Sequence, residues 1–302
     1  MTAPLRIAGF LVALVVALAG GLGLGRLVGP LDTEPAAMPS TAGDGHSHSH
    51  GDEPGDGHSH TAAPRGGSSV AGLTVSEAGY TLVPEATTFP AGKTAPFRFR
   101  ITDRAGRPVL RYAVSHERLM HLIVVRRDLT GYQHLHPSLD ADGTWSAPLR
   151  LPAAGSWRAF ADFTALDAKG ATTPVTLGVD LSVAGEYLPA PLPAATAQDT
   201  VDGYEVTLSG APAVRRQAPL QFTVRRDGKT VTDLEPYLGA YGHLGVLRDG
   251  DLGYVHAHAD KQLADGAIRF WVTVPSPGWY RMFLDFQVGG EVRTAEFTVT
   301  AG

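Results

Sequence analysis

The sequence predicts an all-β protein, with two tandem antiparallel β-sandwich domains behind an N-terminal transmembrane helix and a disordered His-rich segment. Three observations predict this. An internal repeat covers most of the chain after residue 70. Short segments rich in Val, Ile, Phe, Thr and Leu are bounded there by Gly, Pro or Asp, as strands are. No stretch after residue 70 keeps a helical apolar period for three turns.

Residues 1–29 are predicted to form a signal anchor. The apolar run Ile7–Leu24 would measure about 27 Å as a helix, close to the thickness of a membrane's hydrocarbon core. Arg6 precedes the run, which favours a cytoplasmic N-terminus. We therefore expect a single-pass protein of the cell membrane whose C-terminal domains are extracytoplasmic. The alternative is a cleaved signal peptide, which would make the protein secreted.

Residues 30–70 are predicted to be a disordered linker. Pro, Ala, Gly, Ser and Asp dominate this stretch, and it has no apolar periodicity. Imidazoles separated by single small residues can wrap a copper, zinc or nickel ion. The alternative is a solvated spacer whose histidines only titrate. The histidines in this segment are His46, His48, His50, His58 and His60.

The repeat is clearest around two sets of three histidines. The first copy carries His121, His134 and His136 within residues 120–137. The second copy carries them at the same spacing within residues 242–259, as His243, His256 and His258. The repeat predicts one domain over residues 71–185 and a second over residues 200–302, each of ordinary domain size. Pro-rich residues 186–199 would join them as a semi-rigid linker.

Each copy is predicted to be a sandwich of short strands. Strand spacing and turn signals favour an immunoglobulin-like or cupredoxin-like sandwich, and periodicity does not separate the two. The segments that carry this prediction most clearly are Phe97–Ile101, Leu122–Val125, Leu220–Val224 and Arg269–Val274.

The histidines of each copy are predicted to share one sheet face. His134 and His136 are two residues apart, so their side chains leave a strand on the same side. A hairpin turn centred between Leu129 and Thr130 would place residue 121 opposite residue 138, which puts His121 on that face as well. Each domain would then offer a three-His metal cluster. The alternative is that the histidines are structural, since apolar side chains such as Ile123 share their face.

Two aspartates are candidate partners of these clusters. Asp162 and Asp285 stand in the otherwise apolar segments Ala159–Phe163 and Met282–Phe286, where an unpaired charge is costly. They would either bind the metal or orient a ligating histidine. The alternative is an ion pair with Arg158 or Arg281.

The first copy has two further candidate ligands that the second lacks. His116 and Met120 precede its first histidine, whereas the second copy has Leu238 and Gly242 there. A thioether sulfur would suit copper, although Met120 would also fill a hydrophobic core.

The segment from Met120 through His121, Asp128, Tyr132, His134 and His136 to Pro137, followed by Gly155, Arg158 and Phe160, resembles a motif of exported bacterial β-sandwich domains related to YtkA-like and CopC-like proteins. The resemblance covers both copies and is better in the first, because the second has Ala259 and Gly242 in place of Pro and Met. It implies extracytoplasmic handling of copper or another heavy metal and no enzymatic activity.

We therefore expect an extracytoplasmic metal-binding protein for metal homeostasis. Imidazole and carboxylate ligands without thiolate suit Cu(II) or Zn(II), and copper is favoured because outside the cytoplasm it is more often Cu(II). The chain has no cysteine, which excludes disulfides and thiolate ligands. Its net charge of -5 argues against nucleic acid as a partner. A non-catalytic tandem interaction module is the alternative. A metal-dependent hydrolase or oxygenase is less favoured, because no separate general base, nucleophile elbow or phosphate loop is present.

Overall fold

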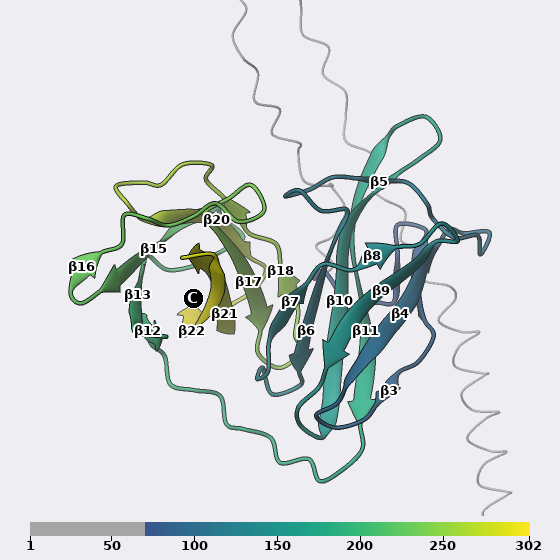
Figure 1. Ribbon diagram of the computed structural model, residues 1–302, viewed down its shortest axis with the longest axis horizontal. Helices are drawn as coiled ribbons and strands as arrows, with labels where there is room; N and C mark the ends of the chain where they lie inside the picture. The colour runs from purple at the N-terminus through teal and green to yellow at the C-terminus, as the bar shows by residue number, and fades with distance from the viewer. Residues whose placement is uncertain (1–69) are drawn as a thin grey trace, which may run out of the picture. The chain divides into compact units, whose positions relative to one another are not determined.

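The structure is a computed structural model that describes residues 70–302 (Figure 1). Within this range every regular element is a strand, which confirms the predicted all-β class for this part of the chain. No helix in the described range is long and apolar enough to cross a membrane. The predicted signal anchor and most of the predicted His-rich linker lie outside the described residues.

The first copy forms two sheets. One has five strands in the order β1-β2-β4-β9-β8. The other has the order β3-β11-β10-β6-β7, and β5 pairs with β10. The strands of the first sheet are β1 (Ser76–Glu77), β2 (Tyr80–Pro84), β4 (Thr94–Thr102), β8 (Ser138–Leu139) and β9 (Thr144–Arg150). Those of the second are β3 (Thr88–Phe89), β5 (Tyr112–Ala113), β6 (Met120–Arg126), β7 (Gln133–Leu135), β10 (Gly155–Leu166) and β11 (Thr172–Val183).

The second copy repeats this arrangement. Its first sheet has the order β12-β13-β15-β20-β14, with β16 on β15 and β19 on β20. Its second sheet has the order β18-β17-β21-β22. The strands of the first sheet are β12 (Gln198–Val201), β13 (Tyr204–Ser209), β14 (Ala213–Val214), β15 (Ala218–Arg226), β16 (Lys229–Thr230), β19 (His258–Ala259) and β20 (Ile268–Val274). Those of the second are β17 (Gly242–Arg248), β18 (Tyr254–Val255), β21 (Gly278–Val288) and β22 (Glu291–Ala301).

The alternation of side chains along β6 shows how each copy uses both faces of its second sheet. Met120, Leu122 and Val124 point into the core between the two sheets of the first copy. His121 and Ile123 therefore lie on the opposite face. In an isolated sandwich that face would meet water, yet both side chains are buried. Something else in the chain must cover the second sheet.

The cover is the equivalent sheet of the other copy. We call the β3-β11-β10-β6-β7 and β18-β17-β21-β22 sheets the site sheets (Figure 1). Their outer faces share a third hydrophobic cluster. Tyr132 stacks on Phe283 with ring centres 4.2 Å apart and planes 2° apart. Phe160 stacks on Tyr254 with ring centres 5.8 Å apart. The buried members of the cluster are Ile123, Val125, Leu129, Phe160, Leu247, Leu252, Tyr254 and Phe283.

Gly245 shows how closely the site sheets approach. A Cβ added to this glycine would lie 2.5 Å from the Tyr132 hydroxyl oxygen, closer than any carbon and oxygen can pack. The corresponding residue of the first copy is Ile123. The missing side chain on β17 therefore makes room for the ring that stacks on Phe283.

The β6–β7 hairpin differs from its predicted register by two residues. Ile123 lies opposite His134, so continuation of the ladder carries residue 121 opposite residue 136 and not 138. The reason is the turn, in which the Leu129 N–H donates to the Arg126 carbonyl at 2.8 Å, with Leu129 in a left-handed conformation at φ 63°. Because the difference is an even number of residues, His121 stays on the predicted face.

Candidate metal centre

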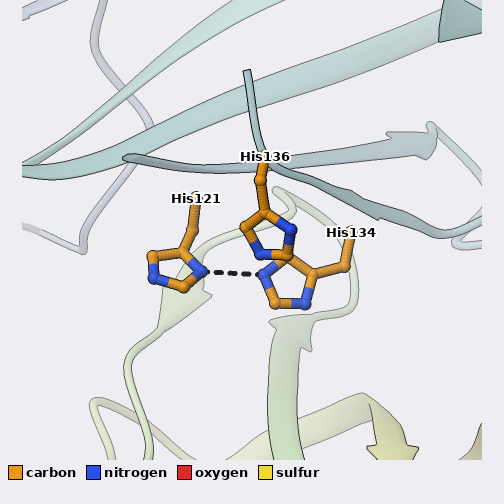
Figure 2. A group of neighbouring side chains, drawn as sticks. All are labelled: His121, His134 and His136. Atoms are coloured by element: carbon orange, nitrogen blue, oxygen red, sulfur yellow. Dashed lines mark hydrogen bonds between the residues drawn. The ribbon is translucent and has the colours of Figure 1, made fainter. Parts of the chain in front are cut away.

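The structure brings the three histidines of the first copy together. His121 lies on β6, His134 on β7, and His136 directly after β7. One ring nitrogen from each lies within 4.8 Å of the others. The ring centres are 5.2 Å apart for His121 and His134, 5.1 Å for His121 and His136, and 4.7 Å for His134 and His136. Figure 2 shows the three rings turned toward one another.

A tight turn orients His121. Its Nε2–H donates to the Ser115 carbonyl at 3.1 Å. The turn from Ser115 to Arg118 holds His116 at φ 47° and Glu117 at φ 60°, the left-handed pair of a type I′ hairpin. Because a carbonyl can only accept a hydrogen bond, Nε2 of His121 carries the ring proton and Nδ1 carries the lone pair.

The second copy orients His243 with the same device. Its Nε2–H donates to the Tyr237 carbonyl at 2.8 Å. The turn there runs from Tyr237 to Ala240, and its left-handed residues are Leu238 and Gly239. His243 therefore also has its lone pair on Nδ1. These carbonyl partners have no signature in the sequence, because any residue type supplies a carbonyl.

The two aspartates orient histidines of the opposite copy. His134 Nδ1–H donates to Asp285 Oδ2 at 2.9 Å, and the two side chains are only 7% and 5% exposed. In the other direction, His256 Nδ1 lies 3.1 Å from Asp162 Oδ2. A threonine hydroxyl donates to the second oxygen of each carboxylate, at 2.6 Å from Thr294 to Asp285 and at 3.0 Å from Thr176 to Asp162.

The predicted alternative for the aspartates, an ion pair with the nearby arginine, does not form. Arg158 pairs with Asp180, and Arg281 pairs with Glu296. The carboxylates instead hold histidines, as carboxylates do beside metal ligands. Asp162 and Asp285 thus each pair with a histidine of the opposite copy. We call these two contacts between the site sheets the crossed pairs.

These hydrogen bonds leave two lone pairs facing each other. His121 Nδ1 and His134 Nε2 lie 2.9 Å apart (Figure 2). Their outer nitrogens hold the ring protons, since a carbonyl and a carboxylate accept them. A third nitrogen, Nε2 of His136, is buried and has no hydrogen-bond partner among the described residues. Electron pairs arranged in this way repel unless a cation lies among them.

Burial works against a proton on three of the neighbouring rings. Burial, followed by the neighbouring His134, lowers the pKa of His121 to about 4. The same two causes lower the pKa of His136 to about 3. Burial also lowers the pKa of His243 to about 4. At neutral pH these rings are therefore neutral, which is the form that binds metal ions.

The second copy also reaches this site. The ring centre of His243 is 5.8 Å from that of His134 and 6.2 Å from that of His121. It is 5.4 Å from the ring centre of His116. A pocket of about 40 Å³, enough for an ion with a water molecule or two, lies between the copies. His136 is not part of its lining, which includes His116, His121, His134, His243, His256 and Asp162.

Some predicted ligands lie elsewhere. Met120 is 1% exposed and fills the core of the first copy, so the suggestion that its sulfur joins the histidines is wrong: it occupies the opposite face of β6 from His121. His256 is 42% exposed on the Asp162 carboxylate. The side chain of His258 is outside what the structure describes, and so are the linker histidines His46, His48, His50, His58 and His60.

No curated protein of similar sequence was found. Among solved structures, the FdeC adhesin of Escherichia coli matches with 16% identity and a TM-score of 0.25, covering 74% of this chain and 64% of that one. Invasin, a bacterial integrin-binding protein, matches with 14% identity and a TM-score of 0.22, covering 76% and 41%. Salmonella alpha-2-macroglobulin matches with 12% identity and a TM-score of 0.26, covering 76% and 15%. The chain spans less than two thirds of each of these structures, and likeness at this level says nothing about what it binds.

A family model matches the chain twice, over residues 74–180 and again over residues 199–302. The two matches include both site sheets and all six histidines of the repeat. The chain thus belongs to the DUF8832 family, a domain of unknown function, and carries two copies of that domain.

Proposed function

We propose that this protein is an extracytoplasmic metal-binding protein for metal homeostasis that holds its ion at His121, His134 and His136. The observation that carries the proposal is the convergence of three imidazole nitrogens within 4.8 Å, two of them with lone pairs facing at 2.9 Å. An ion accepts all three electron pairs at once and satisfies the buried Nε2 of His136. Copper is the favoured metal and zinc the alternative, because the ligands are imidazoles and no thiolate is present.

The rest of the proposal concerns the layout of the chain. Residues 1–29 anchor the chain in the membrane or are cleaved as a signal. Residues 30–70 add a His-rich tail that binds metal. Domains over residues 71–185 and 200–302, joined by residues 186–199, hold the site. This layout and the resemblance to YtkA-like and CopC-like proteins both support an exported metal-handling role without catalysis.

The test is metal binding by the full chain with its five tail histidines changed to serine, which we call the tail-silent chain. We expect equilibrium dialysis to show saturable Cu(II) or Zn(II) binding. In this background His136→Gln should weaken binding at least 100-fold, because it removes a ligand from the centre of the cluster. Met120→Leu is the matched control and should leave the affinity unchanged, because Met120 lies in the core. Undiminished binding by the His136 variant would contradict the proposal.

A second prediction concerns Asp285, which fixes the ring proton of His134 on Nδ1. In Asp285→Asn the amide N–H can donate to Nδ1, so the proton moves to Nε2 and points at His121. We expect metal affinity to fall about 10–100-fold, as for other lost partners of ligating histidines. The metal-free chain should keep its melting temperature, because the Nε2–H can then bond to Nδ1 of His121. A wild-type affinity would show that the tautomer of His134 does not matter.

The second candidate function is a non-catalytic interaction module with structural histidines. The crossed His–Asp pairs favour it, because the contacts of His134 with Asp285 and of His256 with Asp162 join the two copies without a metal ion. It predicts no saturable Cu(II) or Zn(II) binding by the tail-silent chain. The dialysis experiment therefore distinguishes the two functions.

A further inference from the structure

The geometry points to one metal ion per chain, shared between the two copies, with His243 of the second copy as the fourth ligand to the ion held by His121, His134 and His136. This inference rests on the proposed function. It differs from the expectation drawn from the repeat, which is one three-His site in each copy.

The first step is the fit of the three rings to a single ion. Metal–nitrogen bonds of about 2.0–2.1 Å in a tetrahedral set place neighbouring imidazole ring centres about 5 Å apart. The three observed separations in the first copy are 5.2, 5.1 and 4.7 Å. The ring centres therefore have the spacing of three corners of such a set, and a fourth corner is left to fill. The 2.9 Å between His121 Nδ1 and His134 Nε2 would widen to about 3.3 Å around an ion.

The second step is that the pairing of β17 with β21 places His243 beside that corner. On β17, His243 is the direct cross-strand neighbour of Asp285. Asp285 in turn holds His134 of the first copy, so His243 and His134 lie side by side. The ring centre of His243 is 5.8 Å from that of His134 and 6.2 Å from that of His121, about 1 Å beyond the ligating distance. His243 thus lies outside the three-histidine group in the metal-free chain, and our inference requires its side chain to turn toward His134 when the ion binds.

The third step is the chemistry of the His243 ring. Its Nε2–H is held by the Tyr237 carbonyl, which leaves Nδ1 as the nitrogen with a lone pair. The first ligand of the triad is presented in the same way, because His121 gives Nε2 to the Ser115 carbonyl. Both copies thus present their first histidine for ligation through Nδ1.

The fourth step is the inequality of the two copies. His134 is 7% exposed, whereas its counterpart His256 is 42% exposed. The first copy also places His116 beside the site, 6.0 Å from His121 and 5.4 Å from His243 between ring centres. The second copy has Leu238 at that position. Among the side chains that the structure describes, the buried nitrogens therefore gather on the first copy's side, which favours one site over two equal ones.

The test uses the tail-silent chain and counts ions. We expect one bound Cu(II) per chain by elemental analysis after dialysis, with four nitrogen ligands in its electron paramagnetic resonance spectrum. His243→Gln, whose amide can still donate to the Tyr237 carbonyl, should raise the Kd at least tenfold. Met120→Leu, in the core of the first copy, is the matched control and should change the Kd less than threefold. The metal-free melting temperature of each variant reports whether it is folded.

The outcomes separate this inference from the proposed function. Two ions per chain, or an unchanged Kd for His243→Gln with binding still lost in His136→Gln, would overturn the shared site and leave metal binding standing. No binding by the tail-silent chain would overturn both. If His243→Gln does not fold, the spectrum of the unmutated site decides, since three nitrogens and one oxygen would contradict a fourth imidazole.

Discussion

Replacing Phe283 by alanine should lower the free energy of unfolding by about 3–5 kcal/mol, the usual loss for a buried aromatic side chain. Phe283 is 0% exposed, yet it belongs to neither sandwich core. It stacks on Tyr132 of the other copy. The substitution leaves a cavity between the site sheets. The lost free energy therefore comes from the contact between the two copies. Equilibrium unfolding in urea measures it.

Two variants make this prediction specific. Trp279→Ala changes a larger ring on the same strand, but that ring is 43% exposed and should cost less than about 1 kcal/mol. Phe160→Ala removes the counterpart ring, which stacks on Tyr254, and should behave like Phe283→Ala. Equal costs for Phe283→Ala and Trp279→Ala would mean that the copies are not held together through these rings.

Lowering the pH from 7 to 5 should destabilise the metal-free chain steeply. In the folded chain the pKa values of His121, His136 and His243 are about 4, 3 and 4, and burial is the main cause. In the unfolded chain they return to about 6.5, so the unfolded state binds more protons between these limits. The stability is complete above pH 6.5 and is lost as the pH falls. Three protons give a slope of about 4 kcal/mol per pH unit, and His116, whose pKa burial also lowers, adds to it.

The crossed pair of His256 and Asp162 acts against this loss near neutral pH. Burial opposes the charge on His256, but Asp162 raises its pKa above the ordinary value, so its contribution is complete below about pH 6.5, is lost as the pH rises, and offsets part of the loss between pH 7 and pH 5. The pKa of Asp162 is lowered by His256 against the effect of burial, and its contribution is lost only below about pH 4.

Urea unfolding at pH 7 and pH 5 with a chelator measures the slope. His136→Gln should reduce it by about a third, and a flat profile would contradict the assignment.

Much of the fold follows from local sequence patterns. The alternation around Leu122–Val125 and the Gly, Pro and Asp turns predict strands, and the repeat shows that the same strands occur twice. The turn conformation was harder to predict. Leu129 is a non-glycine residue in a left-handed conformation, and it moves the turn centre so that the register differs by two residues. The predicted face of His121 survives because side chains alternate with period two.

The candidate site was predicted only in part, for a physical reason. Periodicity tells which face of a strand a side chain occupies, but not what covers that face. Apolar residues beside the histidines, such as Ile123 and Tyr132, indicated that this face is buried. They did not indicate which part of the chain covers it. Because the cover is the other copy, the partners of His134 and His256 come from residues more than 90 positions away. The unpaired charge of Asp285 inside an apolar strand was the one available signal.

Tyr132 contacts Phe283, and Tyr254 contacts Phe160. The two copies in this single chain therefore pair through equivalent surfaces, as the subunits of an isologous dimer do. In a dimer of identical subunits every substitution appears on both sides of the axis, so the two halves cannot specialise. Fusion removes that restriction. The second copy could then carry Gly245 at the position equivalent to Ile123 of the first copy, and Leu238 at the position equivalent to His116. Tethering also keeps the two halves together at any dilution, which a pair of separate subunits cannot do.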